Sequence, residues 1–216
     1  MFLVFDTETT GLPKRWNAPI SDHENWPRCV QIAWQLHDDF GACIEHKDYI
    51  VSPEGFDIPY ESEQIHGIST ALATKEGSAI NSILADFTAA LAKSKYIIGH
   101  NVKFDINIIG AELDRLGLDT SITTTPILDT CTEHTATLCQ IPGGRGGKFK
   151  LPTLSELYKN LFDDDFDQAH NATADVEATA RTFFELLRIN KFPVDQITAG
   201  ERLVSRLNET FKETVP

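Results

Sequence analysis

Short apolar runs and helix-spaced apolar residues divide the chain into an early region of strands and a later region of mixed elements. Apolar, β-favouring residues fill 1–5, 30–36 and 42–51. Asp38-Asp39-Phe40-Gly41 separates the last two runs and is typical of a hairpin turn. We therefore expect these runs to form the first three strands of one sheet, with the strand at 1–5 buried and a polar loop at 13–27.

Apolar residues recur at helical spacing farther along the chain, and two short apolar runs lie among them. The spacing predicts helices over 80–91, 106–116, 154–161 and 176–187, and the short runs predict strands at 96–99 and 126–129. Strands followed by alternating helices and strands are typical of an α/β sheet covered by helices.

The last segment, 191–216, follows the fourth of these predicted helices. Leu203, Leu207 and Phe211 are spaced by four, which predicts a further amphipathic helix. The length of 216 residues suits one domain with a full core. We expect a domain over 1–190 and a helical extension over 191–216 that either packs on it or links it to a partner.

Charge and cysteine usage narrow the functional classes. The formal net charge is −13, whereas proteins that bind nucleic acid without sequence preference are usually basic. An enzyme that meets phosphates through metal ions is still compatible, because metal-binding carboxylates count as negative. Four scattered cysteines without a Cys-x-x-Cys motif suit reduced thiols. With no bilayer-length apolar run and no signal peptide, we expect a cytoplasmic protein without a membrane partner.

Two carboxylates end the first predicted strand. Asp6 and Glu8 are two residues apart, so on a strand they point to the same side. Such close acids raise each other's pKa unless a cation intervenes, and paired hard oxygens suit Mg²⁺ or Mn²⁺. Taken alone, the pair is better explained as incidental acids in an exposed turn.

Two later segments place further acids at predicted helix starts. Asp105 lies in the first turn after Gly99-His100-Asn101, where Asn101 suits an N-cap and His100 suits a structural hydrogen bond. Asp175 lies near the start of the 176–187 helix, after His170 and the possible N-cap Asn171. Each segment alone is compatible with simple helix capping. Together with Asp6 and Glu8, they can hold two divalent ions for displacement at phosphorus, with a histidine to accept a proton.

The same three segments carry a family resemblance. They are Phe5-Asp6-Thr7-Glu8-Thr9-Thr10-Gly11-Leu12, His100-Asn101-x-x-Phe104-Asp105 and His170-Asn171-Ala172-x-x-Asp175. In order and separation they resemble the three motifs of the DEDDh 3′→5′ exonucleases, a group that includes bacterial proofreading subunits and ribonucleases. The resemblance covers roughly residues 1–190.

The resemblance implies a ribonuclease H-like fold with a mixed five-stranded sheet whose second strand is antiparallel. It implies that two Mg²⁺ or Mn²⁺ ions are bound by Asp6, Glu8, Asp105 and Asp175, with His170 as general base. It also implies that Asp129 lies near the site without binding metal. The remaining implied residues contact the substrate: Thr7, Thr9, Thr10, Gly11, Leu12, His66, Asn101 and Phe104.

Two loops depart from the minimal pattern of the DEDDh family. The 16–26 insertion carries Trp16 and Trp26, which could stack on a base or pack within the loop itself. The glycine-rich loop at 142–150 carries Arg145, Lys148 and Lys150, which could grip a nucleic-acid backbone or face solvent.

We expect a DNA 3′→5′ exonuclease that acts on a single-stranded or frayed 3′ end, with a DNA polymerase subunit or domain as a possible partner in proofreading. An exoribonuclease and a non-catalytic nucleic-acid-binding or polymerase-binding protein are the alternatives. The complete set of five residues argues against the second alternative.

Overall fold

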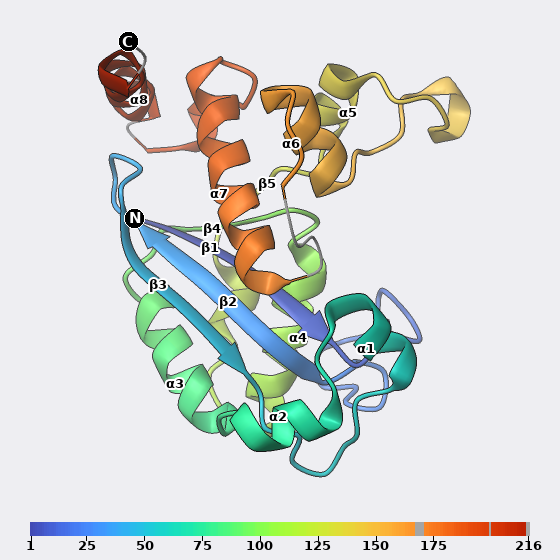
Figure 1. Ribbon diagram of the computed structural model, residues 1–216. Helices are drawn as coiled ribbons and strands as arrows, with labels where there is room; N and C mark the ends of the chain where they lie inside the picture. The colour runs from blue at the N-terminus through green and yellow to red at the C-terminus, as the bar shows by residue number, and fades with distance from the viewer. Residues whose placement is uncertain (167–170, 199, 215–216) are drawn as a thin grey trace.

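A five-stranded mixed sheet forms the centre of the computed structural model, which describes residues 1–166, 171–198 and 200–214 (Figure 1). The sheet order is β3-β2-β1-β4-β5, where β2 is antiparallel to both β1 and β3, and β1, β4 and β5 are parallel. This confirms the expected mixed sheet with an antiparallel second strand. The strands are β1 (Phe2–Thr9), β2 (Cys29–His37), β3 (Cys43–Ile50), β4 (Tyr96–Gly99) and β5 (Ile127–Asp129).

The predicted hairpin joins β2 to β3. Asp38 is the residue that shapes the turn, because its Oδ1 accepts hydrogen bonds from the backbone N–H groups of Phe40 and Ala42. Gly41 has a φ of 86°, a conformation that glycine adopts without steric cost.

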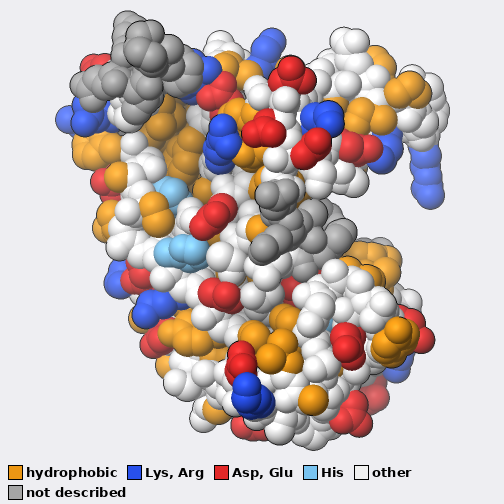
Figure 2. All heavy atoms as spheres, in the orientation of Figure 1, with side chains coloured by type: hydrophobic (Ala, Val, Ile, Leu, Met, Phe, Trp, Pro, Cys, Tyr) orange, Lys and Arg blue, Asp and Glu red, His pale blue; other side chains and the backbone are white. Residues whose placement is uncertain are grey.

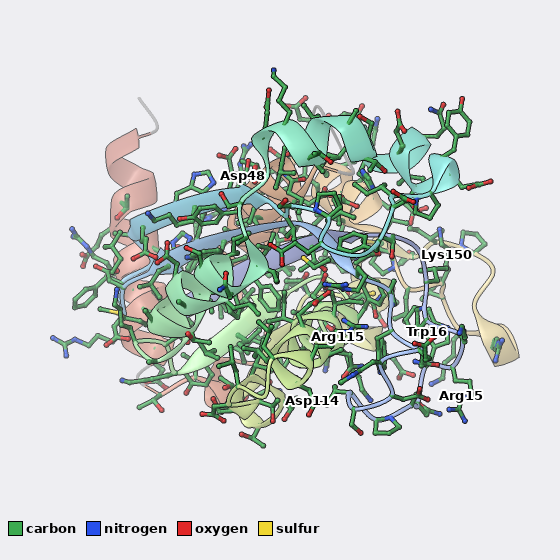
Figure 3. All side chains as sticks on the ribbon, turned by 90° about the horizontal axis from the view of Figure 1, so that it is seen from below. Arg15, Trp16, Asp48, Asp114, Arg115 and Lys150 are labelled. Atoms are coloured by element: carbon green, nitrogen blue, oxygen red, sulfur yellow. The ribbon has the colours of Figure 1, made fainter. Side chains whose placement is uncertain are left out.

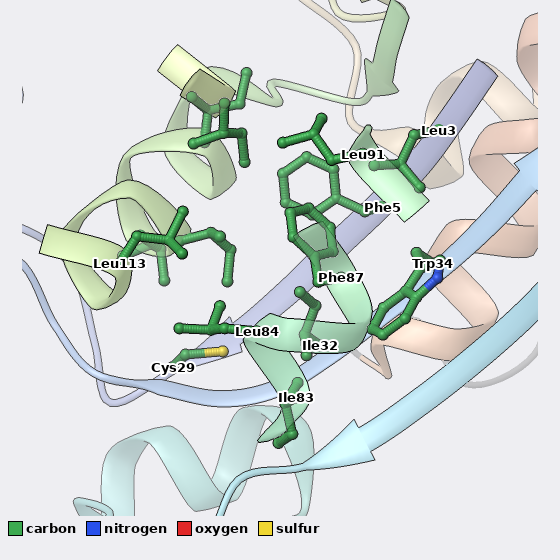
Figure 4. Packing of buried hydrophobic residues seen from close by; sticks show 14 of the residues in the cluster. Leu3, Phe5, Cys29, Ile32, Trp34, Ile83, Leu84, Phe87, Leu91 and Leu113 are labelled. Atoms are coloured by element: carbon green, nitrogen blue, oxygen red, sulfur yellow. The ribbon is translucent and has the colours of Figure 1, made fainter. Parts of the chain in front are cut away.

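One face of the sheet packs against α3 (Ile80–Leu91) and α4 (Lys103–Arg115). Side chains alternate across a strand, so Leu3 and Phe5 of β1 point into this layer. Phe87 of α3 makes edge contacts with Phe5 and Trp34, with ring centroids 5.2 Å and 5.5 Å away (Figure 4). This core fixes α3 and α4 against one face of the sheet.

The other face packs against α7 (Ala172–Arg188), and α8 (Gly200–Thr214) lies against α7 (Figure 1). Phe2 and Val4 of β1 point into this second core. Leu203 of α8 is buried there, with Leu207 packed beside it, whereas the side chain of Phe211 lies outside the described residues. In the part of the chain that the structure describes, every helix is too short or too polar to cross a membrane.

Three seven-residue helices are absent from the sequence prediction, whereas α6 (Leu154–Phe162) was expected. Each of the three spans about two turns, too few for apolar periodicity to show. Local caps help to define two of them: Ser69 accepts from the N–H of Leu72, and Thr132 forms a capping box with Thr135. The three are α1 (Tyr60–His66), α2 (Thr70–Glu76) and α5 (Glu133–Cys139).

Candidate active site

β1 carries Asp6 and Glu8 past the point where its parallel neighbour stops. Pairing between β1 and β4 ends at Val4 opposite Ile98, while β2 continues alongside β1 through Glu8. The side of β1 next to β4 is therefore open from Asp6 onward. The first turn of α4 reaches β1 in this region.

Asp105, in the first turn of α4, reaches β1 there. Its Oδ1 accepts hydrogen bonds from the Thr7 backbone N–H at 3.1 Å and from the Thr7 hydroxyl at 2.6 Å. Thr7 itself is buried. Its side chain therefore supports Asp105.

The start of α4 is fixed by Asp129, and the prediction that Asn101 caps this helix is wrong. Asn101 adopts a left-handed backbone with φ 61°, and the cap position falls on Val102, which makes no side-chain cap bond. Asp129, at the end of β5, instead accepts from the N–H groups of Asn101 at 2.9 Å and Val102 at 3.2 Å. Gly99 is required before this turn, because a Cβ there would lie 2.4 Å from a Val102 methyl group.

Asp175 comes from the first turn of α7. Asn171 caps this helix as predicted, since its side chain accepts from the N–H of Thr173 at 3.1 Å. The N–H of Ala172 donates to Oε1 of Gln31 at 3.3 Å, and Gln31 is the β2 residue that pairs with Glu8. That hydrogen bond holds the start of α7 beside Glu8. His170, the expected base, lies outside the described residues.

Three carboxylates converge at the end of β1. Asp6, Glu8 and Asp175 each offer one carboxylate oxygen, and these oxygens all lie within 4.8 Å of one another. Asp105, only 4% exposed, lies close enough to raise the pKa of both Asp6 and Glu8. We call these four residues the acid cluster. Within the described ranges, Asp6, Glu8 and Asp105 form no ion pair with a lysine or arginine.

Burial and mutual repulsion make these groups hard to ionise. Burial, then Asp175 and Asp105, raise the pKa of Glu8 to about 8. Burial raises the pKa of Asp105 to about 7, against the opposing effect of the Thr7 hydrogen bonds. Burial is also the main cause of the strongly raised pKa of Asp6, followed by the charges of the other acids. Divalent cations would remove this penalty, and carboxylate oxygens are ligands that such hard cations prefer.

Hydrogen bonds anchor the turn that follows β1. Thr9 donates its hydroxyl hydrogen to the Gly11 carbonyl at 2.7 Å, and the backbones of Thr10 and Arg28 are hydrogen-bonded at 3.0 Å. Leu12 is 73% exposed at the end of this turn. An exposed leucine on an anchored turn is available for packing on a base.

His66 approaches the same turn from α1. Its ring is nearly buried, and Nδ1 accepts from the N–H of Ile68 at 3.1 Å. Burial lowers the pKa of His66, while the neighbouring carbonyl of Thr9 acts in the opposite direction. The structure thus brings His66 to the first motif.

Other candidate residues have structural partners. His100 bonds to the Thr130 hydroxyl at 3.0 Å and the Pro152 carbonyl at 2.9 Å, as expected of a structural histidine. In the basic loop, Lys148 pairs with Glu133 and Lys150 with Glu156. Ion pairs of these two lysines therefore connect the loop to α5 and α6.

A buried ionic cluster next to the site lies outside the three sequence motifs. Glu112 of α4 is 1% exposed and binds Arg28 Nε at 2.9 Å and Arg115 Nη1 at 3.1 Å. The Arg28 partner lies 84 residues away in the sequence. No local pattern connects the two, although a glutamate on the apolar face of a predicted helix is a signal that a buried partner exists.

The sequence matches a known protein family. An exonuclease family model, RNase_T, matches residues 3–183. The chain is 29% identical over 205 residues to the 3′-5′ exonuclease DinG of Bacillus subtilis, covering 94% of the chain and 19% of that protein. It is 28% identical over 214 residues to a PolC-type DNA polymerase III of Caldanaerobacter subterraneus, covering 98% of the chain and 13% of that protein.

Solved structures agree on the fold. Exonuclease I of E. coli in complex with a dT13 oligonucleotide superposes with a TM-score of 0.68 at 22% identity, covering 87% of this chain and 40% of that one. The chain thus spans a fifth or less of the two named relatives and under half of this structure. The sheet, α4 and the start of α7 fall within the 3–183 match, apart from Phe2 of β1. The chain belongs to the RNase_T exonuclease family, a 3′-5′ exonuclease family of ribonuclease H-like fold.

Proposed function

We propose that this chain is a divalent-metal-dependent exonuclease that removes 5′-mononucleotides from the 3′ end of DNA. The observation that carries the proposal is the acid cluster, in which oxygens of Asp6, Glu8 and Asp175 lie within 4.8 Å of one another. Such a concentration of buried carboxylates is unfavourable in a structural role, because each ionisation is opposed by burial and by its neighbours.

The donor set fits hard divalent cations. Asp6, Glu8, Asp105 and Asp175 would hold two Mg²⁺ or Mn²⁺ ions, since these ions favour carboxylate oxygens. Bound ions would supply positive charge at the scissile phosphate and favour ionisation of the attacking water. The chain's own contribution is to fix the acids: Thr7 orients Asp105, and Gln31 holds the start of α7 that bears Asp175.

Two further roles follow from position and resemblance. His170 precedes the capped start of α7 and would accept the proton of the attacking water, because a histidine titrates near neutral pH. Leu12, Thr9 and His66 would frame the terminal nucleotide, with Thr10, Gly11, Asn101 and Phe104 contributing to the pocket. Asp129 would act by holding the backbone before α4.

DNA is the proposed substrate because of the relatives. The related DinG protein is named as a 3′-5′ exonuclease, PolC-type relatives are DNA polymerases, and exonuclease I was solved with DNA oligonucleotides. The PolC-type relatives also support a polymerase partner and a proofreading role. Four unpaired cysteine thiols suit the cytoplasm, where such an enzyme would meet DNA.

A nuclease assay tests this proposal. End-labelled single-stranded DNA, mismatched duplex DNA and RNA are incubated with Mg²⁺, Mn²⁺ or EDTA. We expect metal-dependent release of 5′-mononucleotides, fastest from single-stranded DNA, and its loss in Asp6→Asn. Asp195→Asn, at an exposed acid outside the cluster, should retain full activity. Failure to degrade any substrate with either metal would refute the proposal, and faster digestion of RNA would establish the exoribonuclease alternative.

A further inference from the structure

An exposed tryptophan lies against a motif residue next to the acid cluster. Trp16, from the 13–27 loop, is 54% exposed. Its ring centroid lies 5.8 Å from that of Phe104, at an interplanar angle of 53°. Phe104 directly precedes Asp105 in α4. We call Trp16 and Phe104 the aromatic platform.

The backbone around Trp16 is held firmly. The side chain of Asn25, only 4% exposed, accepts from the N–H of Arg15 at 2.7 Å and donates to the Arg15 carbonyl at 3.0 Å. Arg115 of α4 donates to the carbonyls of His23 and Trp26, at 2.9 Å and 2.7 Å. The exposure of Trp16 is therefore a property of an anchored loop.

The loop has a second tryptophan that already serves as its core. Trp26 is 2% exposed, and its Nε1 donates to the Pro19 carbonyl at 3.0 Å. Packing of the loop by its own aromatics is thus accomplished without Trp16. The half-exposed ring of Trp16 is therefore available for a contact outside the loop.

Basic residues adjoin the platform in an otherwise acidic protein. Lys14 and Lys103 are exposed, each within two residues of a platform ring, and neither forms an ion pair within the described ranges. On the face shown in Figure 2, acidic and basic side chains of the described residues are interspersed. Two exposed lysines close in sequence to an exposed ring suit the phosphates and bases of a single strand.

The platform lies beside the first turn of α4, far from α8. Figure 3 shows Arg15 and Trp16 at the end opposite α8. Leu12, which we place on the terminal base, lies four residues before Trp16 on the same loop. Trp16 is therefore close in sequence to the proposed terminal-nucleotide pocket, and its ring contacts Phe104 of α4.

We propose that Trp16, backed by Phe104, stacks on the base that precedes the terminal nucleotide of a single-stranded substrate, with Lys14 and Lys103 facing its phosphates. This inference rests on the proposed exonuclease function. A base held in a duplex is already stacked and paired, so the platform would favour an unpaired 3′ end. Stacking of one base on an aromatic side chain corresponds to about a tenfold change in binding.

Two substrates distinguish binding of the preceding base from hydrolysis at the terminal nucleotide. Oligothymidylate supplies a preceding base, whereas the p-nitrophenyl ester of thymidine 5′-monophosphate contains only a terminal nucleotide. We expect Trp16→Ala to raise KM for oligothymidylate about tenfold and to leave hydrolysis of the ester within about twofold. Trp16→Phe should recover much of the loss. Phe40→Ala, at an exposed aromatic in the β2–β3 turn, is the matched control and should change neither substrate.

The kinetic outcomes decide the proposal. Unchanged KM for oligothymidylate in Trp16→Ala would overturn it. An equal loss on both substrates would also overturn it, since Trp16 would then serve the terminal nucleotide or the loop. If the wild-type chain hydrolysed neither substrate, the exonuclease proposal would fail, and binding would still test the platform.

Fluorescence provides that independent reading. Trp26 and Trp34 are buried, so Trp16 should dominate any quenching when oligothymidylate is added in Ca²⁺. We expect quenching in the wild type and its loss in Trp16→Phe, whereas equal quenching in both would contradict stacking. Replacing Lys14 and Lys103 by glutamine should reduce the slope of log Kd against log salt by about 1.4. An unchanged slope would remove the lysines from the proposal.

Discussion

Two buried carboxylates on α4 have opposite surroundings. Glu112 is 1% exposed and meets two arginines and the N–H of Cys29, the last at 3.0 Å. Asp105, two turns earlier, is 4% exposed. The effects that lower its pKa are hydrogen bonds from Thr7 and from its own backbone. The same helix thus buries Glu112, which is paired with arginines, and Asp105, which faces other carboxylates.

The difference separates a structural role from a functional one. The arginines around Glu112 hold neighbouring segments. The Arg28 carbonyl accepts from the Thr10 N–H, the Arg28 N–H donates to the Thr10 hydroxyl, and Arg115 binds the 13–27 loop. Glu112 therefore braces the loops that frame the proposed substrate pocket. Asp105 and its acidic neighbours have no such internal compensation, and we propose that external cations supply it. Four variants or conditions test this contrast.

Asp105→Asn should produce the largest effect, and it should appear in activity. We expect nuclease turnover to fall on the order of 10⁴-fold, about 5 kcal/mol in the barrier, because a proposed metal ligand is lost. Metal-free stability should be unchanged or higher, since a source of repulsion is removed. Turnover assays and urea unfolding in EDTA measure the two quantities. A large loss of stability would place Asp105 in the same structural class as Glu112.

Glu112→Gln should show the reverse pattern. Removing one partner of a buried ionic cluster leaves the other charges uncompensated and costs about 3–5 kcal/mol of unfolding free energy. Activity per folded molecule should fall much less than in Asp105→Asn. Urea unfolding measures the loss of unfolding free energy. Wild-type stability in this variant would contradict the structural role of Glu112.

Stability of the metal-free protein should fall as pH rises from about 5 to 8. Ordinary carboxyl groups in the unfolded chain titrate near 4, whereas Asp105 titrates at about 7 and Glu8 at about 8 in the fold. The folded state therefore binds more protons across this window, and raising the pH favours unfolding. Thermal unfolding in EDTA should show the fall, and Mg²⁺ should stabilise most at the upper end. The pH dependence should persist in Glu112→Gln and flatten in Glu8→Gln.

Thr7→Val should have the smallest effect of the four. It removes the 2.6 Å hydroxyl contact to Asp105 and keeps the shape and the backbone N–H contact. Groups that orient a metal ligand typically contribute about 10-fold to 100-fold in affinity or activity, and the retained N–H favours the lower value. Mn²⁺ affinity and turnover should fall together. Thr10→Val, which alters a hydroxyl outside the acid cluster, should leave Mn²⁺ affinity unchanged.

Local patterns predicted the sheet and the acids, whereas long-range contacts escaped them. The strand that ends in Asp6 and Glu8 was predictable because apolar runs and residue alternation are local properties. Asn101 was misread because its turn is held by Asp129, 28 residues later. The short helix α1, which carries His66, shows too few turns for periodicity. The partnership of Glu112 with Arg28 depends on the folded chain and leaves no local pattern.

Titration of Mn²⁺ into the wild-type chain, Asp105→Asn and Glu112→Gln at pH 8, followed by electron paramagnetic resonance, tests the central contrast most directly. We predict saturable binding of two ions per wild-type chain, loss of at least one in Asp105→Asn, and both retained in Glu112→Gln while it remains folded. The absence of saturable binding in the wild type, or equal binding by wild type and Asp105→Asn, would contradict the assignment of the acid cluster as a metal centre.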